Sequence, residues 1–541
     1  MDNQPPEFRT EPVTPGSIRL PPARALAFPL AFTLALLCLG FLTPVRQHAN
    51  LWGSFVGAGI ALVSWSAVLF GSARRSGRTF TLQLVLPRQH YVQACAQASV
   101  LLYWGWYWPE VYDSAHLIAA QILFAYAFDI LLGWSSRNTY VLGLAPIPVI
   151  FSINLFLWFR PDWFYLQFLM VALGFAAKEL IRWPKEGRSA HIFNPSSFPL
   201  AIFSVALIAT GMSDATWAKD IAITQFFPSE IYLVLFLVSL PGQYLFGVTS
   251  MTISAVVTTY LFGLLYFAAT GTYYFFDSYI PIAVFLGMHL LFTDPSTSPR
   301  TELGRILFGA AYGLSTVALY QILWAAGVPT FYDKLLQVPI LNLSIKAFDR
   351  AARSNMLRVL DPARLGRSLA PRQRNLAWMF AWAIAFGIIS TAEGVGDRHR
   401  GQWVPFWQEA CSAGRPNACP YLAGMQSNMC NAGSGWACNE FAIRQDELDV
   451  DGPGPLASLR DGCDLGFPAA CANRDSMRAG VSGLRSAPPT LDDFPILLRG
   501  SKGPVTDTNP ADLYALACAQ GWANTCGRVG EIGGRTSVDL R

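Results

Sequence analysis

Hydrophobic residues are collected in long runs, separated by short polar segments, over most of this chain. Runs of about 17 to 25 apolar residues are long enough to cross a bilayer as helices. The runs lie near residues 25–43, 51–71, 91–108, 115–134, 139–159, 163–181, 195–212, 230–248, 251–270, 279–293, 304–327 and 376–392. They predict an α-helical fold class, a polytopic membrane bundle of about 11–13 spans. The Pro-rich, polar residues 1–24 are expected to form a disordered cytoplasmic N-terminus.

Composition agrees with a lipid-embedded protein. Charged residues make up 14% of the chain and hydrophobic residues 52%, whereas soluble domains contain about 25% charged residues. The formal net charge of +4 is spread over loops. The expected partner of this surface is therefore membrane lipid, and nucleic acid is not expected.

Arginine and lysine predict the orientation, because cytoplasmic loops are enriched in them. Basic residues collect in three loops between runs: Arg74, Arg75, Arg78 and Arg88; Lys178, Arg182, Lys185 and Arg188; Arg300 and Arg305. The loops around Glu110, Asp214 and Asp277 then lie outside. This alternation is consistent with a cytoplasmic N-terminus.

One basic segment does not fit this alternation. Residues 346–375 carry eight basic residues and are expected inside, yet the span ending near Gly327 delivers the chain outside. The short apolar run 332–348 is the candidate for a further crossing, which gives thirteen in all. We therefore predict a transmembrane domain over 25–348, a basic cytoplasmic linker at 349–375 and a last transmembrane helix at 376–392.

Eight cysteines in the tail repeat one spacing, Cys-x2-Gly-x3-Ala/Thr-Cys. The expected disulfide pairs are Cys411 with Cys419, Cys430 with Cys438, Cys463 with Cys471, and Cys518 with Cys526. Regularly spaced cysteines after a membrane segment favour disulfides, which persist in an oxidising compartment such as the bacterial periplasm. Four-cysteine zinc binding is the alternative, although no Cys-x2-Cys pair is present to suggest it. We expect a multi-pass protein of the bacterial inner membrane with residues 400–541 in the periplasm.

Two similar motifs interrupt the membrane domain at the cytoplasmic side. Phe193-Asn194-Pro195-Ser196-Ser197 opens one span, and Thr293-Asp294-Pro295-Ser296-Thr297 closes another. A capping residue followed by Pro is typical of a helix N-terminus, and paired helix ends in a membrane protein can present N–H groups to an anion. Asn194, Thr293 and Asp294 are therefore candidate cofactor-binding residues, with ordinary helix capping as the alternative.

At these motifs the chain resembles a known family. Leu291-Phe292-Thr293-Asp294-Pro295-Ser296-Thr297-Ser298-Pro299, followed by Gly304-Arg305-Ile306-Leu307-Phe308-Gly309-Ala310, resembles the signature of the D subunit of Rnf complexes and the B subunit of the sodium-translocating NADH:quinone oxidoreductase (the RnfD/NqrB family). His191-Ile192-Phe193-Asn194-Pro195 is similar to a second family landmark. The resemblance covers roughly residues 25–350. It implies a flavin-binding membrane subunit of an electron-transfer complex.

The same resemblance points to a site for covalent flavin mononucleotide (FMN). The family carries FMN through a phosphoester on the threonine of Asp-Gly-x-Ser/Thr-x-Ala-Thr, and here the chain reads Thr210-Gly211-Met212-Ser213-Asp214-Ala215-Thr216. Thr216 is the candidate attachment residue and Ser213 a second motif position, whereas Thr210 replaces the family's aspartate. An ordinary polar turn is the alternative. A second, non-covalent flavin is also compatible with the resemblance.

The tail resembles cysteine-rich Sel1-like repeats, α/α hairpins with one disulfide each. The glycine three residues after each first cysteine is suited to end one helix in a left-handed turn, which brings the second cysteine within bridging reach. Such repeats bind proteins through a concave face. A periplasmic protein is therefore an expected partner of the tail.

The sequence favours a flavin-dependent electron-transfer subunit, a possible oxidoreductase component, that acts with other redox-complex subunits. The six histidines show no clustered metal-ligand spacing. NADH oxidation, if it is relevant, belongs to a partner. A non-redox transporter is the alternative, as is a membrane anchor or scaffold with a protein-binding tail. The sequence identifies neither the electron donor and acceptor nor any coupled ion.

Overall fold

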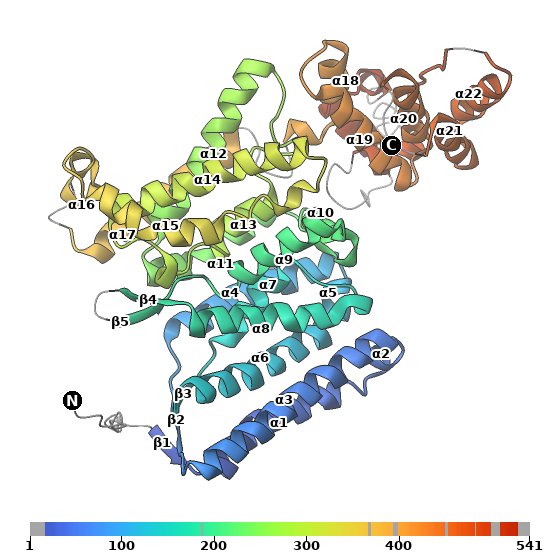
Figure 1. Cartoon of the computed structure of the whole chain (residues 1–541). Coiled ribbons are helices and arrows are strands. Elements are labelled where there is room, and N and C mark those ends of the chain that lie inside the picture. The colour runs from blue at the N-terminus through green and yellow to red at the C-terminus, as the bar shows by residue number, and fades with distance from the viewer. Residues whose placement is uncertain are drawn as a thin grey trace, which may run out of the picture.

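The protein folds as a helical bundle with a separate cluster of helices at one end (Figure 1). A computed structural model describes residues 17–185, 188–365, 369–392, 399–448, 453–481, 483–498 and 509–528. The expected helical class, with a disulfide-bonded α/α tail, is confirmed.

The first half of the bundle packs around α6. Helices α1 and α8 both contact it, and α3 contacts α1 and α8. These neighbours bury α6 more completely than the other long apolar helices are buried. The helices of this half are α1 Pro22–Leu39, α2 Thr43–Arg46, α3 Ala49–Arg75, α4 Arg88–Tyr107, α5 Glu110–Asp113, α6 Ala115–Ser136, α7 Pro146–Asn154 and α8 Phe164–Leu180.

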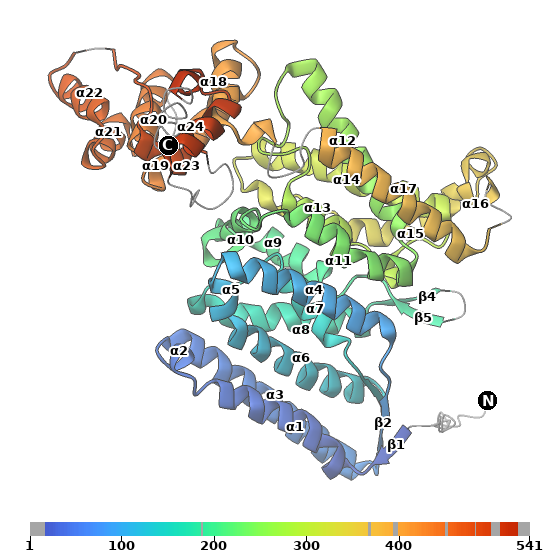
Figure 2. The same ribbon diagram turned by 180° about the vertical axis from the view of Figure 1, so that it is seen from behind.

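The second half is organised by a close pair, α12 and α14. A Cβ added at Gly309 would lie 2.1 Å from the carbonyl oxygen of Met251, so only glycine permits this approach. Helix α17 crosses the outside of this half, against α11 and α12 (Figure 2). The helices are α9 Ser197–Thr210, α10 Ala218–Thr224, α11 Ile231–Phe246, α12 Thr249–Thr270, α13 Ile282–Leu290, α14 Glu302–Ala325, α15 Val338–Ala352, α16 Pro362–Leu365 and α17 Pro371–Ala392.

Seven helical segments of the described chain are long and apolar enough to cross a membrane. The other predicted runs also form helices, but α7, α9, α11, α13 and α15 are shorter and α4 is less apolar. The architecture is therefore compatible with a multi-pass membrane protein. The seven segments are Pro22–Leu39, Ala49–Arg75, Ala115–Ser136, Pro161–Leu180, Thr249–Thr270, Glu302–Ala325 and Pro371–Ala392.

Short strands mark one end of the bundle, which we call the strand end (Figure 1). Strands β1 Ser17–Leu20, β2 Phe80–Leu84 and β3 Thr139–Leu142 form one sheet in the order β1-β2-β3, antiparallel and then parallel. Strands β4 Arg182–Lys185 and β5 Arg188–His191 form an antiparallel pair. The opposite end carries the cysteine-rich cluster, and we call it the tail end.

Strand β1 corrects the expected disordered N-terminus. Residues 1–16 lie outside the described chain, but Ser17 pairs with Gln83 in β2 and α1 begins at Pro22. The polar composition of this segment predicts disorder, whereas pairing with an exposed strand edge gives Ser17–Leu20 a fixed conformation.

Helix α15 also shifts a predicted boundary. It begins at Val338 and ends at Ala352, so it extends into the linker expected at 349–375, and α17 begins at Pro371 rather than at 376. The extension has a cause, because Asp349 on α15 accepts hydrogen bonds from the backbone N–H of Arg300 and Thr301. These contacts bring the end of α15 to the start of α14 at the strand end. The run 332–348, for which the sequence inferred a further crossing, therefore forms a helix, α15, of 15 residues.

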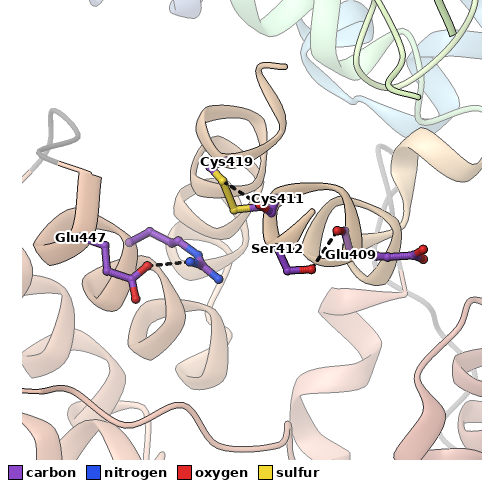
Figure 3. The surroundings of a disulfide bond; sticks show 6 residues. Glu409, Cys411, Ser412, Cys419 and Glu447 are labelled. Atoms are coloured by element: carbon purple, nitrogen blue, oxygen red, sulfur yellow. Dashed lines mark hydrogen bonds and ion pairs between the residues drawn. A yellow bond between two sulfur atoms is a disulfide. The ribbon is translucent and has the colours of Figure 1, made fainter. Parts of the chain in front are cut away.

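The tail is a series of helices joined by the predicted disulfides. All four expected pairs are bonded, with Cα–Cα distances of 4.6–4.8 Å, and Figure 3 shows the first, Cys411–Cys419. The glycine three residues after each first cysteine has positive φ, between 64° and 102°. The predicted left-handed turns are therefore confirmed. The helices are α18 Val404–Ser412, α19 Ala418–Asn431, α20 Gly435–Leu448, α21 Pro455–Asp464, α22 Pro468–Arg478, α23 Phe494–Leu497 and α24 Pro510–Ala519.

Candidate functional site

Thr216 lies in a tight turn at the tail end of the bundle. Helix α9 ends at Gly211, whose φ of +67° reverses the chain, and the 3₁₀ helix η2 Ser213–Ala215 follows. Thr216 then pairs with Phe159, and the backbone N–H of Trp217 donates to the carbonyl of Trp158. The turn is therefore fixed to the segment that follows α7.

The hydroxyl of Thr216 is covered in this conformation. The residue is 2% exposed, and its Oγ1 donates to the carbonyl of Ser213 at 2.9 Å and accepts from the N–H of Ala218 at 3.3 Å. An enzyme that modified this oxygen would first have to open the turn. Breaking each hydrogen bond costs about 1 kcal/mol net, so local opening is a modest barrier.

The neighbouring motif residues have different environments. Ser213 Oγ accepts a hydrogen bond from the Tyr332 hydroxyl at 3.0 Å, which joins the turn to the 3₁₀ helix η4 Thr330–Tyr332. Thr210 donates to the carbonyl of Ala206 within α9, and Asp214 is exposed. Thr210 thus ends a helix and contacts no other motif residue through its hydroxyl.

Four tryptophans pack beneath the Thr216 turn. Trp108 stacks on Trp158 with ring centroids 5.5 Å apart, and Trp104 and Trp217 lie 5.1 and 6.1 Å from Trp108. The guanidinium of Arg160 lies 4.0 Å from the Trp217 ring, a cation–π distance. Sequence reasoning missed this aromatic cluster, because its members come from α4 and from two segments distant in sequence.

Asn194 at the strand end acts as a cap and a cross-link. Its Oδ1 accepts from the N–H of Ser196 and Ser197, and its Nδ2 donates to the carbonyl of Leu291 at 3.0 Å. The amide of Asn342 on α15 accepts from Asn194 N–H. The Oδ1 atom therefore caps the loop before α9, and the Nδ2 atom joins that loop to the segment before Thr293.

Asp294 belongs to a compact polar cluster. Its Oδ1 accepts from the N–H and the hydroxyl of Ser296, and its Oδ2 lies 3.6 Å from His191 Nε2. Burial alone would raise the pKa of Asp294, but hydrogen bonds and charge from His191 and the Ser296 donors lower it to about 2. Thr293 donates to the carbonyl of His289.

This cluster contains Ser, His and Asp but lacks the relay geometry of a hydrolase. A catalytic histidine uses one ring nitrogen for the serine and the other for the aspartate. Here His191 Nε2 lies 2.8 Å from Ser296 Oγ and also faces Asp294. The arrangement is a charged helix cap, and it supports no nucleophilic chemistry.

The helix N-termini expected to bind an anion are occupied by the protein. Asp294 caps the 3₁₀ helix η3 Pro295–Thr297, because its side chain accepts from the N–H of Ser296. The next helix start, that of α14, is occupied as well, because Asp349 accepts from the N–H and the hydroxyl of Thr301. At the start of α9, the side chain of Asn194 accepts from the N–H groups of Ser196 and Ser197. The structure therefore uses both motifs for capping, the alternative that the sequence left open.

The five candidate cofactor residues lie at opposite ends of the bundle. Helix α9 separates Asn194 from the Thr216 turn by 14 residues, which is about 21 Å at 1.5 Å per residue. Thr293 and Asp294 lie with Asn194, and Ser213 lies with Thr216. One flavin cannot contact both groups, so only the tail-end group is a candidate attachment site.

Metal chemistry has no evident site in the described residues, which contain no group of three or more His, Cys, Asp or Glu side chains able to hold an ion. The zinc alternative for the tail is overturned, because the eight cysteines of the pattern are paired in disulfides.

A cavity of about 530 Å³ lies between the bundle and the tail. Helix α10, which directly follows Thr216, forms part of its wall through Lys219 and Ile223, and Asp333 and Lys334 form another part. Met425 and Met429 of α19 close it from the tail. The sequence signalled only the adjacent charges Asp333 and Lys334 in an apolar run, because the cavity depends on how the tail docks.

No family model, curated protein or solved structure matches this chain. The likeness to the Rnf and NADH:quinone oxidoreductase subunits, and that of the tail to Sel1-like repeats, therefore rests on the motifs quoted above.

Proposed function

We propose that this chain is the flavin-carrying membrane subunit of an electron-transfer complex similar to the Rnf and sodium-translocating NADH:quinone oxidoreductase complexes. The observation that carries the proposal is the position of Thr216. Its turn lies at the end of the bundle that also carries the four disulfides. A transferase in the compartment where those disulfides form would reach this turn.

The orientation follows from two independent kinds of chemistry. Disulfides persist in an oxidising compartment, so the tail end faces the periplasm of a bacterial inner membrane. Arginines Arg74 and Arg75 end α3 at the strand end, where they are exposed. Basic residues favour the cytoplasmic side, which assigns the strand end to the cytoplasm.

Attachment of FMN would use the Thr216 hydroxyl as the nucleophile. Its Oγ1 forms a new bond to the phosphorus of an activated flavin diphosphate, the bond to the second phosphate breaks, and the hydroxyl proton passes to the transferase. FMN bound in this way takes up or releases electrons singly or in pairs. The tryptophans around Trp158 and Trp217 give the turn a rigid apolar floor.

The tail extends the proposed function to assembly. Its disulfide-bonded helices are suited to bind a periplasmic protein, and other redox-complex subunits would supply the electron donor and acceptor. Nothing in the described chain assigns a coupled ion.

Covalent labelling tests the function. Co-expression with a flavin transferase is expected to give a fluorescent band on a denaturing gel, because a phosphoester survives SDS. Thr216→Val should abolish the band, and Thr210→Asp should strengthen it by restoring the acid of the motif. Thr391→Val is the matched control, since Thr391 is exposed at the end of α17 and lies outside the motif.

A membrane anchor or a non-redox transporter is the second candidate. The covered hydroxyl of Thr216 and the threonine at position 210 favour it. Wild-type protein that stays dark, in cells where an authentic family member is labelled, would reject flavinylation and support this candidate.

A further inference from the structure

The tail is docked on the bundle by specific contacts. Gly401 approaches the carbonyl oxygen of Phe276 so closely that an added Cβ would lie 2.2 Å from that oxygen. Arg415 donates to the carbonyl of Gly271 at 2.9 Å, and Tyr421 packs against Trp324 with ring centroids 5.4 Å apart. The cavity between the two parts therefore lies at a fitted interface.

The cavity walls are suited to a flat aromatic molecule. Phenylalanines line the bundle side, and two methionines of α19 and Ile496 of α23 line the tail side. Aromatic rings stack on planar ligands, and methionine sulfur makes favourable contacts with ring edges. The volume of about 530 Å³ lies within the range of about 300–1,000 Å³ typical of small-molecule sites. The phenylalanines are Phe226, Phe227, Phe275, Phe276 and Phe331.

One wall carries a buried charged pair. Asp333 is 2% exposed and Lys334 is 5% exposed, and Asp333 Oδ1 lies 3.7 Å from Lys334 Nζ, too far for a hydrogen bond. This oxygen has no hydrogen-bond partner anywhere in the described chain. Buried charges are unfavourable unless they are hydrogen-bonded. Both residues line the cavity, and the carboxylate of Asp333 retains one oxygen without a hydrogen-bond partner among the described residues.

We propose that this cavity binds a planar heterocycle with an imide edge, and that the tail completes the site. The imide N–H donates to Asp333, and the adjacent carbonyl accepts from Lys334. The isoalloxazine ring of a flavin has this edge. Its choice as the ligand rests on the proposed function, and the ring could come from a flavin on Thr216 or from a free flavin.

Riboflavin is the probe for this site, because it has the same ring and lacks the phosphate needed for esterification. The full chain, purified from cells without flavin transferase, would be titrated with riboflavin and followed by fluorescence quenching. Wild-type protein should bind, and Met429→Trp, which fills the cavity from the tail, should weaken binding at least tenfold. Leu465→Trp is the matched control, since Leu465 is an exposed tail residue outside the cavity.

Asp333→Asn and Lys334→Met test the charged pair without filling the cavity. Each removes a charged hydrogen-bond partner, and we expect affinity to fall roughly tenfold. Non-reducing peptide mapping and the thermal unfolding midpoint show whether each variant is folded. Two results would overturn the proposal: no riboflavin binding by wild-type protein, or equal binding by wild type, Met429→Trp and Asp333→Asn.

Thr216→Val tests the cavity independently of covalent flavin attachment. It also shows whether a flavin in the cavity comes from Thr216 or is free. The variant should bind riboflavin like wild type, because Thr216 is not a wall residue. A second titration uses protein made with the transferase present. If the attached flavin ring occupies the cavity, labelled wild type should no longer bind riboflavin, whereas the unlabelled variant should still bind it. Riboflavin binding by both proteins would assign the cavity to a free flavin. A dark gel with intact riboflavin binding would reject only covalent attachment.

Discussion

The hydroxyl of Tyr332 donates a 3.0 Å hydrogen bond to the Oγ of Ser213 across 119 positions of sequence. This bond joins the Thr216 turn to the segment that carries Asp333 and Lys334. The carbonyl of Ser213 in turn accepts from Thr216 Oγ1. Tyr332 therefore stabilises the closed conformation in which the candidate attachment oxygen is covered.

Loss of this bond should ease flavin attachment. Tyr332→Phe removes roughly 1 kcal/mol from the closed turn, so the initial rate of labelling at Thr216 should rise roughly fivefold. Gel fluorescence against time of co-expression measures that rate. Tyr126→Phe is the control, because it removes a similar bond, to the carbonyl of Gly143, at the strand end. Unchanged or slower labelling of Tyr332→Phe would show that turn opening does not limit the reaction.

The tail disulfides should contribute measurably to stability. Replacing Cys463 and Cys471 with serine removes the constraint on a short loop, and the chain-entropy estimate gives a loss of about 2.5 kcal/mol in free energy of unfolding. Limited proteolysis of the tail over a temperature series measures the shift. Cys38→Ser, which removes a free exposed cysteine, should have no effect. Equal protease resistance of the double variant and wild type would contradict this estimate.

Asp277 should make the stability of the folded protein depend on pH. Burial raises the pKa of this carboxyl from 3.8 to about 6, against the opposing effect of the Ser278 hydrogen bond. The folded state thus holds the proton more tightly than the unfolded state. Its contribution to stability is fully present below about pH 4 and is lost as the pH rises through 6.

The difference between wild type and Asp277→Asn isolates this contribution. Asp333, Lys334 and Lys219 line the same cavity, and their titration is common to both proteins. At each pH, the unfolding temperature of the variant is subtracted from that of wild type. This difference should fall by a few degrees as the pH is raised from 4 to 7. Intrinsic tryptophan fluorescence records the midpoint. A difference that stays constant over this interval would mean that Asp277 does not titrate there.

The helices of the bundle and the disulfides were predictable because each depends on a local rule. A long apolar run forms a helix that is able to cross a bilayer. The basic residues around Arg353 predicted a further helix in the run 332–348, and α15 forms there. The repeated cysteine spacing needs only one left-handed glycine, such as Gly414, to bring its two sulfurs together.

The cavity and the turn could not be predicted from such rules. They depend on contacts between distant segments, including Gly401 with Phe276 and Tyr332 with Ser213. The capping motifs were recognised, but Asp349, which occupies the N-terminus of α14, lies 48 residues from Thr301. A motif alone does not show whether a helix end is free or already occupied.

Reporter fusions test the proposed orientation. A reporter active only in the cytoplasm should work when fused after Arg353, where α15 has ended, and one active only outside should work after Ala392, where α17 ends. The two positions lie on opposite sides of one helix, so each fusion controls for the other. External activity at Arg353 would show that α15 does not cross the membrane and that the positive-inside rule fails here.

Asn194→Ala distinguishes a structural cap from a cofactor ligand at the strand end. The variant loses the acceptor for Ser196 and Ser197 and the donor to Leu291, so the free energy of unfolding should fall by roughly 1–3 kcal/mol. Flavin labelling of Thr216 should persist in the fraction that folds, because α9 separates the two sites. Asn50→Ala, which removes an exposed bond to Asp162 at the opposite end, should leave both quantities unchanged. A variant of normal stability that loses its flavin would instead make Asn194 a cofactor ligand, and the two ends of the bundle would then have to be coupled.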